Sequence, residues 1–313
     1  MDLVTLDDIR SAADRVGPVV FRTPLVPAWE TGLWIKPESL QPVGSFKLRG
    51  AVNAVARLDP VARARGVVTH SSGNHGQALA YAARAVGAPC TVVVPQGAPQ
   101  IKIDKIRAYG AEVVLVPPSE RLVEARRVAA DTGRTIVPPY DHRDVIAGQG
   151  TIGLEIVADL PDVDVVLVPV GGGGLASGVA TAVKALRPST TVLGVEPELA
   201  ADARDSLAAG EVVVWEVDRT WRTSADGLRT HLSPLTLAHL RARLDGIVTV
   251  SEEEIAATVG RLTRDARLVA EPSGAVALAA RLFRAAELPA GRTVAVLSGG
   301  NVDPAVLASA LER

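Results

Sequence analysis

Val163-Asp-Val-Val-Leu-Val-Pro-Val170 runs directly into Gly171-Gly-Gly-Gly174, and the alanine-rich run Leu175-Ala-Ser-Gly-Val-Ala-Thr-Ala-Val183 follows. The first run is short and β-branched, as in a buried strand, and the last has the composition of a helix. Residues 165–183 carry no charge and have the length of a membrane span. Pro169 and the glycines would leave backbone groups unpaired in lipid. The stretch therefore predicts a strand, a loop and a helix of an α/β fold.

The same alternation of short Val/Ile-rich runs with longer alanine- and arginine-rich segments continues from Gly66 onward. It is typical of parallel strands covered by helices. Helices are predicted at 74–86 and 119–131, and another begins at the capping box Ser251-Glu-Glu-Glu254. The predicted strands are residues 67–70, 91–95, 112–117, 135–137, 163–170, 191–196 and 293–297.

The composition excludes several classes of protein. The 313 residues include 33 basic and 35 acidic side chains, which leaves no positive excess for binding nucleic acid. Hydrophobic residues make up 48% and charged residues 22%, as in an ordinary soluble globular protein. Cys90 is the only cysteine, and the N-terminus does not resemble a secretory signal. We therefore expect a cytoplasmic protein that binds neither nucleic acid nor membrane.

Few of the basic residues are lysines, and these are Lys36, Lys47, Lys102, Lys105 and Lys184. Lys47 stands in Gly44-Ser-Phe-Lys-Leu-Arg-Gly50, with a glycine on each side. Such surroundings can desolvate a lysine, which lowers its pKa and frees the amine to act as nucleophile and base. The other four are expected to be solvated surface charges.

Two glycine-containing turns follow predicted strands, where open α/β sheets collect ligands. The first, Ser71-Ser-Gly-Asn-His-Gly-Gln77, opens a helix and presents amides and hydroxyls that suit a carboxylate or phosphate. A capped turn without a ligand is the alternative. In the second, Gly171, Gly172, Gly173 and Gly174 let successive amides surround a phosphate. Glycines for close packing are the alternative there. Gly171-x-Gly173-x-x-Ala176 with Glu196 also fits an NAD-dependent dehydrogenase.

A third turn, Ser298-Gly-Gly-Asn301, ends the last predicted strand. A hydroxyl at that place can reach a flat ring packed against the backbone. A tight turn before the helix led by Asp303-Pro304 explains the same residues.

Six segments together resemble the fold type II pyridoxal-phosphate enzymes, and among them the serine racemase and threonine/serine dehydratase family. The segments lie in the family's order along nearly the whole chain, at residues 38–51, 70–78, 147–151, 168–174, 225–227 and 297–301. The resemblance implies a tryptophan synthase β-like fold with two lobes, each with a mainly parallel sheet covered by helices. It leaves the dehydrogenase a distant alternative, since a dehydrogenase has no use for Lys47.

The resemblance also implies the roles of the cofactor-binding residues. Lys47 holds pyridoxal 5'-phosphate covalently and later removes the Cα proton, and Phe46 packs against the ring. Asn74 bonds the 3-hydroxyl, the glycines 171–174 hold the phosphate, and Ser298 meets the pyridine nitrogen. A neutral hydroxyl leaves that nitrogen largely unprotonated and weakens the ring as an electron sink. Prompt β-elimination is then favoured over a long-lived carbanion.

The implied reaction is dehydration of serine or threonine to a 2-oxo acid and ammonia. The substrate carboxylate is expected on Ser71, Ser72, Gly73, Asn74 and His75. Ser72 matches the residue that returns a proton in racemases, so a serine or aspartate racemase, or a bifunctional enzyme, is an alternative. A purely structural or binding role, as in relatives that keep the fold and lose the lysine, is the non-enzymatic alternative, and the presence of Lys47 argues against it.

Arg121 and Thr230 fall near the position where racemases contact the distal end of the substrate. An arginine there favours an acidic substrate such as 3-hydroxyaspartate, and a solvated arginine at a helix start is the alternative.

The family's divalent-cation site matches Glu196, the carbonyl of Ala200 and Asp202, where hard oxygen ligands suit Mg²⁺ or Ca²⁺. Surface acids at the start of a helix are the alternative.

The resemblance places a large discontinuous domain at residues 1–65 and 142–313 and a small mobile domain at 66–141. A homodimer is the family's usual assembly. Because the chain ends soon after Ser298, we expect no C-terminal regulatory domain.

Overall fold

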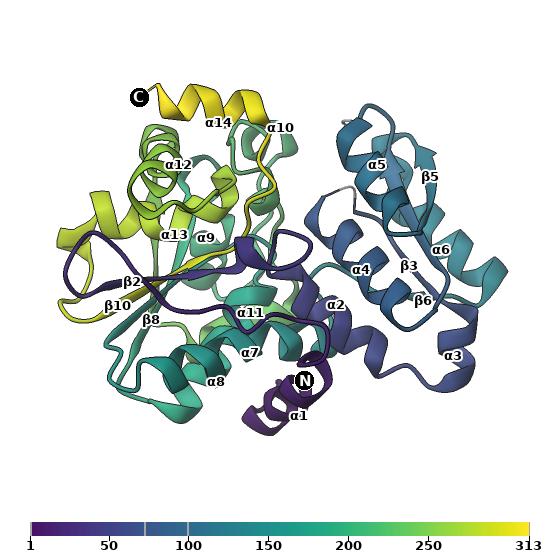
Figure 1. Ribbon diagram of the computed structural model, residues 1–313, viewed down its shortest axis with the longest axis horizontal. Coiled ribbons are helices and arrows are strands. Elements are labelled where there is room, and N and C mark those ends of the chain that lie inside the picture. The colour runs from purple at the N-terminus through teal and green to yellow at the C-terminus, as the bar shows by residue number, and fades with distance from the viewer. Residues whose placement is uncertain (1, 72, 99, 313) are drawn as a thin grey trace.

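A computed structural model describes residues 2–71, 73–98 and 100–312. Two separate sheets organise the molecule, and Figure 1 shows them as two units side by side. The larger unit holds both termini, and the smaller unit consists of the segment from α3 (Pro60–Arg65) to β6 (Thr135–Ile136). Helix α2 (Lys47–Ala56) lies where the two units meet.

The larger sheet has six strands in the order β1-β2-β10-β7-β8-β9. All its neighbouring strands are parallel except the β1–β2 pair. Its strands are β1 (Val26–Pro27), β2 (Leu33–Pro37), β7 (Val165–Pro169), β8 (Thr191–Pro197), β9 (Gly246–Val250) and β10 (Thr293–Leu297). Alternate residues of β7 enter different hydrophobic clusters, Val165 and Leu167 one and Val166 and Val168 the other. Both faces of this sheet are therefore buried, which explains its nearly continuous apolar strands.

Helices cover both faces of the larger sheet. Helices α12 (Glu252–Ala266), α13 (Pro272–Phe283) and α14 (Pro304–Leu311) pack on one face. On the other face lie α7 (Arg143–Asp159), α8 (Gly174–Leu186), α9 (Asp202–Ala209) and α11 (Pro234–Arg243). Helix α1 (Leu6–Val16) packs outside α7, and the short α10 (Val217–Thr220) follows α9 along the chain.

The smaller sheet has four parallel strands in the order β5-β4-β3-β6. Its remaining strands are β3 (Val67–Thr69), β4 (Cys90–Pro95) and β5 (Glu112–Val116). Helices α4 (Asn74–Ala85) and α5 (Gln100–Ala108) cover one face, and α6 (Arg121–Thr132) covers the other. All its strands lie within residues 67–136, inside the small domain proposed at residues 66–141.

The predicted α/β fold is confirmed, with each predicted strand found to within two residues at either end. The capping box is present, because Ser251 Oγ accepts a hydrogen bond from the amide of Glu254. Strands β1, β2 and β9 were not predicted. Strand β2 reads Leu-Trp-Ile-Lys-Pro, and Lys36 interrupts its apolar pattern. Lys36 was expected at the surface, but its side chain is buried. The stretch 165–183 forms β7, the glycine loop and α8, and no helix in the described residues has the length and hydropathy of a membrane span.

Candidate active site

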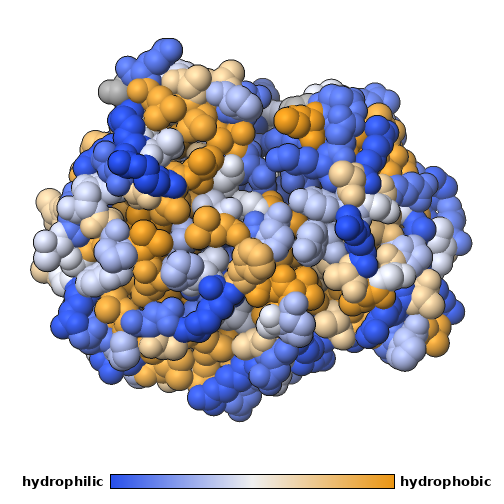
Figure 2. Space-filling model, viewed as in Figure 1, coloured by the Kyte–Doolittle hydropathy of each residue, from blue (hydrophilic) through white to orange (hydrophobic). Residues whose placement is uncertain are grey.

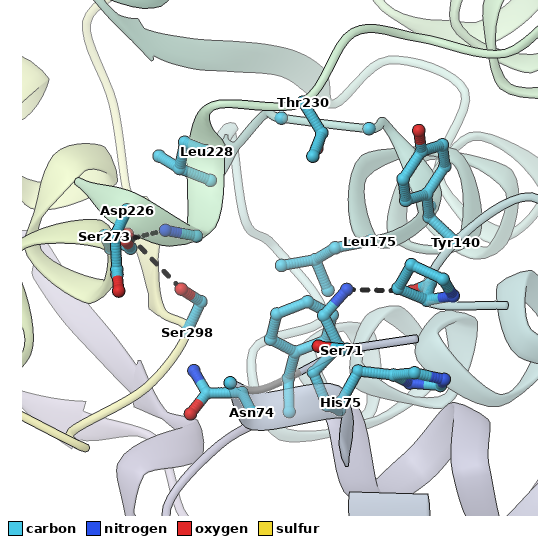
Figure 3. A pocket seen from close by; sticks show the side chains of 18 of the residues that line it. Ser71, Asn74, His75, Tyr140, Leu175, Asp226, Leu228, Thr230, Ser273 and Ser298 are labelled. Carbon is cyan, nitrogen blue, oxygen red and sulfur yellow. Dashed lines mark hydrogen bonds between the residues drawn. The ribbon is translucent and has the colours of Figure 1, made fainter. Parts of the chain in front are cut away.

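A cavity of about 320 Å³ lies between the two units, lined by residues of both. The space-filling view shows the surface hollowed between the units at its upper edge (Figure 2). Figure 3 shows Asn74 and His75 of the smaller unit on one side of the cavity and Thr230 and Tyr140 across from them. The turns that follow β3, β7 and β10 all reach the cavity, as the C-terminal ends of parallel strands should.

Lys47 begins helix α2 and points into the cavity. Its Nζ donates a hydrogen bond of 2.8 Å to the carbonyl oxygen of Pro139 and lies 4.9 Å from the centre of the Phe46 ring. Burial lowers the pKa of this amine to about 8, and the distant charge of Glu271 opposes that shift only in part. A substantial neutral fraction near neutral pH makes Lys47 a competent nucleophile and base.

The glycine loop, Gly171, Gly172, Gly173 and Gly174, leads from β7 into α8. Gly173 has a φ of 82°, which favours glycine. A Cβ on Gly172 would lie 2.4 Å from a ring carbon of Tyr140, and one on Gly174 would lie 2.8 Å from the Cβ of Tyr140. The loop and the N-terminus of α8 line the cavity and provide free amides, so these residues fit the phosphate of a cofactor.

Asn74 and Ser298 both line the cavity. Asn74 donates a hydrogen bond of 2.6 Å to Glu271 and accepts one of 2.8 Å from Asn301. The Ser298 hydroxyl is buried and reaches the carbonyl of Ser273 at 3.4 Å. Asn74 is thus held by the side chains of Glu271 and Asn301, whereas Ser298 is held by a backbone carbonyl in the first turn of α13.

Glu271 was missed by sequence reasoning. It is 6% exposed and lines the cavity beside Asn74. Burial, together with the negative charge of Asp226, raises the pKa of its carboxyl to about 7. The only local sequence feature at this position is Glu271-Pro272, and the same pair is common at the start of an ordinary helix with proline in its first turn. The sequence therefore did not mark Glu271 as a residue of the site.

The predicted carboxylate turn lies beside Lys47. Ser71, Gly73, Asn74 and His75 all line the cavity, whereas Ser72 falls outside the described residues. His75 Nε2 lies 2.9 Å from the carbonyl of Val137, so this nitrogen carries the proton. Burial and the charge of Lys47 lower the pKa of His75 to about 3. The imidazole is therefore neutral and adds no charge to the turn.

Arg121 and Thr230 both line the cavity. The Nε of Arg121 donates a hydrogen bond to the carbonyl of Pro118, and its other nitrogens form no ion pair among the described residues. Beside it, burial and the charge of Arg121 lower the pKa of His70. Tyr140 was not predicted, although it forms the wall behind Gly172. Its position depends on contacts between segments far apart in sequence.

The predicted cation ligands lie outside the cavity lining. Glu196 and Asp202 are buried, at 1% and 2% exposed, and neither forms an ion pair within the described residues. Burial raises the pKa of both carboxyls, that of Glu196 to about 8. Glu196 accepts hydrogen bonds from the amides of Ala203 and Arg204 at the start of α9. Glu196 and Asp202 carry the hard oxygen atoms that Mg²⁺ or Ca²⁺ prefers, but both oxygens of Glu196 already accept amide hydrogen bonds, and no group of three acid, histidine or cysteine side chains gathers in the described chain.

Comparison with known proteins gives a consistent family. The model of the family described as "Pyridoxal-phosphate dependent enzyme" matches residues 16–299. The L-threo-3-hydroxyaspartate ammonia-lyase of Saccharomyces cerevisiae is 38% identical over 312 residues, 97% of this chain and 95% of that protein. The serine racemase of Arabidopsis thaliana is 42% identical over 310 residues, 94% of this chain and 92% of that protein. The solved structure of a threonine deaminase from T.th. has a TM-score of 0.90 and 45% identity, over 96% of this chain and 99% of that one.

Proposed function

Because the chain belongs to the pyridoxal-phosphate-dependent enzymes, we propose that it is an ammonia-lyase that removes water from a β-hydroxy amino acid, serine or threonine. The observation that carries the proposal is the amine of Lys47, which is enclosed without an ion-pair partner among the described residues and faces a glycine loop built for a phosphate. The family includes both eliminating and racemising enzymes, and the weak electron sink beside Ser298 supports elimination.

Each part of the cofactor would be held by different residues of the cavity. The glycines 171–174 and the N-terminus of α8 would bind the phosphate, Phe46 would pack against the ring, and Asn74 would orient the 3-hydroxyl. Ser298 would face the ring nitrogen with a neutral hydroxyl. When bound, the cofactor supplies an electron sink for the pair left at the substrate Cα.

Lys47 would act on the substrate as a base, taking the Cα proton in its neutral form. The carboxylate would lie on the turn of Ser71, Gly73, Asn74 and His75, where free amides at the start of α4 can bind it. Loss of the β-hydroxyl as water, followed by hydrolysis of the enamine product, converts serine to pyruvate and ammonia with no external oxidant or reductant. Closure of the smaller unit would exclude bulk water from the cavity.

The test uses purified protein supplemented with pyridoxal phosphate. L-serine, L-threonine and 3-hydroxyaspartate are each incubated with it, and the 2-oxo acid is measured. A visible cofactor band that shifts on addition of substrate, with 2-oxo acid formed from serine or threonine, is expected. A colourless protein, or one that leaves all three substrates unchanged, would overturn the proposal.

A second candidate substrate is 3-hydroxyaspartate, and Arg121 favours it. Arg121 lines the cavity, and its two terminal nitrogens, which have no partner among the described residues, can bind a second carboxylate. The yeast relative is named for this activity. If the substrate is dicarboxylic, Arg121→Gln lowers kcat/KM for 3-hydroxyaspartate far more than for L-serine. An equal change for both would remove this candidate.

Racemisation is the third possibility, because Ser72 matches the proton-returning residue of the racemases and a plant relative at 42% identity is named a serine racemase. The same incubations therefore include a measurement of D-serine. Loss of D-serine with retained 2-oxo acid formation in Ser72→Ala would make the enzyme bifunctional. No D-serine from the wild type would leave a dehydratase.

A further inference from the structure

The residue two positions after Lys47 leads to an inference beyond the catalytic groups. Successive residues of an α-helix are about 100° apart, so Lys47 and Arg49 project from opposite sides of α2. Lys47 enters the cavity, whereas the Arg49 side chain is 0% exposed and enters the interior of the larger unit. The reactive amine and the buried guanidinium therefore belong to the same turn of α2, so a shift of that turn moves both groups.

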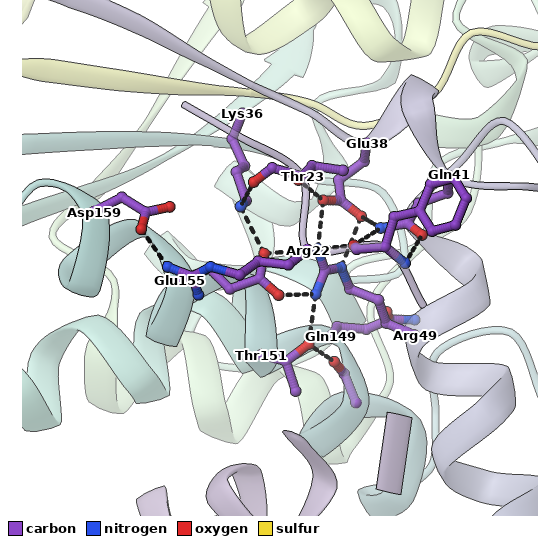
Figure 4. Close-up of polar contacts among 12 residues, drawn as sticks. Arg22, Thr23, Lys36, Glu38, Gln41, Arg49, Gln149, Thr151, Glu155 and Asp159 are labelled. Atoms are coloured by element: carbon purple, nitrogen blue, oxygen red, sulfur yellow. Dashed lines mark hydrogen bonds and ion pairs between the residues drawn. The ribbon is translucent and has the colours of Figure 1, made fainter. Parts of the chain in front are cut away.

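Arg49 is fully engaged by charged and polar partners (Figure 4). Its Nε and Nη2 donate to the two carboxylate oxygens of Glu38 at 2.7 and 2.8 Å. Its Nη1 and Nη2 donate to Glu155 at 2.7 and 2.9 Å, and Nη1 also reaches the Thr151 hydroxyl at 3.0 Å. Such paired forks hold a guanidinium in one orientation as well as one place.

Lys36 completes this group, which we call the buried ion cluster: Lys36, Glu38, Arg49 and Glu155. The Nζ of Lys36 lies 2.6 Å from Glu155, and the Lys36 side chain is 0% exposed. Two positive and two negative charges balance, which makes their burial tolerable. The cluster joins four elements, since Lys36 lies on β2, Glu38 begins the short helix η1 (Glu38–Leu40), Arg49 lies on α2 and Glu155 lies on α7.

The helices that the cluster joins are also in direct backbone contact. A Cβ on Gly148 of α7 would lie 2.5 Å from the carbonyl oxygen of Arg49, and the amide of Gly50 donates to Gln149 at 3.1 Å. Pro139, whose carbonyl receives Lys47, lies just before α7 begins at Arg143. The donor, Lys47 Nζ, lies on α2, and the acceptor, the carbonyl of Pro139, lies close to the start of α7. The position of α2 relative to α7 therefore determines the distance between these two groups.

From these contacts we propose that Arg49, held by Glu38 and Glu155, is a positioning residue that fixes the first turn of α2 and thereby keeps the Lys47 amine enclosed in the cavity. The pair Arg57–Asp144 offers a natural contrast, because it joins the residue that follows the last turn of α2 to α7 at 2.8 Å while the Arg57 side chain is 51% exposed. An exposed pair of this kind contributes little to position.

The experiment compares Arg49→Lys with Arg57→Lys as the matched control. Arg49→Lys keeps the positive charge but loses the paired hydrogen bonds that the guanidinium donates to Glu38 and Glu155. In the full chain stripped of cofactor, the rate of Lys47 acetylation is measured against pH by mass spectrometry. The wild type is expected to titrate at about 8, whereas Arg49→Lys should titrate closer to an exposed lysine. In the holoenzyme, a displaced amine should lower kcat/KM on the order of 10²-fold. Arg57→Lys should match the wild type in both measurements.

Glu155→Gln is the second variant and serves if Arg49→Lys does not fold. The thermal midpoint of every variant is recorded. A lower midpoint with an unchanged acetylation profile and unchanged kcat/KM per folded molecule would show that the cluster only stabilises the fold, and would overturn the inference. The inference rests on the proposed role of Lys47, but the acetylation profile requires no turnover. Failure of the proposed function would leave that profile intact, so the two failures are distinguishable.

Discussion

Lys36 and Lys47 stand eleven positions apart, Lys36 fully buried and Lys47 half-buried at the cavity, yet only Lys36 has a counter-charge in contact among the described residues. Lys36 Nζ lies 2.6 Å from Glu155 within the buried ion cluster. Lys47 Nζ reaches only the neutral carbonyl of Pro139 among the described residues. Burial lowers the pKa of both amines, and the adjacent Glu155 opposes the shift of Lys36, whereas only the more distant Glu271 does so for Lys47. Burial alone therefore does not make an amine reactive; burial without an adjacent acid does.

The largest expected effect separates the two amines by reactivity. Lys47→Ala should lower turnover by about 10³-fold or more, because both the covalent anchor and the base are lost. The thermal midpoint should change little, since no ion pair is broken. Steady-state 2-oxo acid formation checks this, with Lys184→Ala of the exposed Lys184–Asp245 pair as the control. Full activity in Lys47→Ala would remove the basis of the comparison.

The second effect separates the same amines by stability. Lys36→Met leaves an acid-rich cluster uncompensated, which should lower the free energy of unfolding by about 3–5 kcal/mol. Lys184→Met at the surface should cost about 0–1 kcal/mol. Urea denaturation measures both. The folded fraction of Lys36→Met should still take up pyridoxal phosphate covalently, and equal stability losses in the two variants would contradict the assigned role of the cluster.

A chelator extends the comparison to Glu196 and Asp202, two buried acids that form no ion pair in the described part of the chain. If they hold Mg²⁺ or Ca²⁺, removing the ion should lower the free energy of unfolding by about 1–3 kcal/mol. Thermal unfolding is recorded with chelator and after the cation is restored. Asp202→Asn should be insensitive to both additions. A wild-type curve that does not respond to chelator would leave the two acids as helix-start residues only.

The shape of the cavity gives a smaller effect. Gly172→Ala places a Cβ 2.4 Å from the Tyr140 ring, which should weaken pyridoxal phosphate binding by about 1–3 kcal/mol. Tyr140→Ala in the same chain should recover part of that loss. Equilibrium titration with the cofactor measures the affinity. Gly17→Ala, whose new Cβ would meet its nearest atom at an ordinary 3.5 Å, is the control, and an equally weakened Gly17→Ala would point to a general effect.

The smallest effect concerns the pH dependence of stability. The pKa of Glu271 rises from an ordinary value to about 7 in the fold. The native state then retains a proton that the unfolded state loses, so the wild type should lose stability as pH rises from about 5 to 7. Glu271→Gln should lose less over that range. Urea midpoints at several pH values test this, and parallel curves for the two proteins would exclude a raised pKa for Glu271.

Local patterns were sufficient for the catalytic elements. A short β-branched run, a glycine loop and an alanine-rich run predicted β7, its loop and α8, because strand, turn and helix propensities act over neighbouring residues. Lys47 was identified by its flanking glycines and a family motif, and it faces the cavity. The same reasoning was wrong about Lys36, which was expected at the surface and is completely buried. Its partner Glu155 lies on α7, far away in sequence, and no local pattern could join them.

The sequence by itself determined the α/β architecture, the glycine loop and the identity of Lys47, because each depends on a contiguous stretch of residues. Only the tertiary structure decided which lysine is free and which is paired, since that depends on the packing of α2 against α7. The same packing brings Tyr140 behind Gly172 and Glu271 beside Asn74. Electrostatic environments are made by residues that are distant along the chain, and folding is what brings them within a few ångströms.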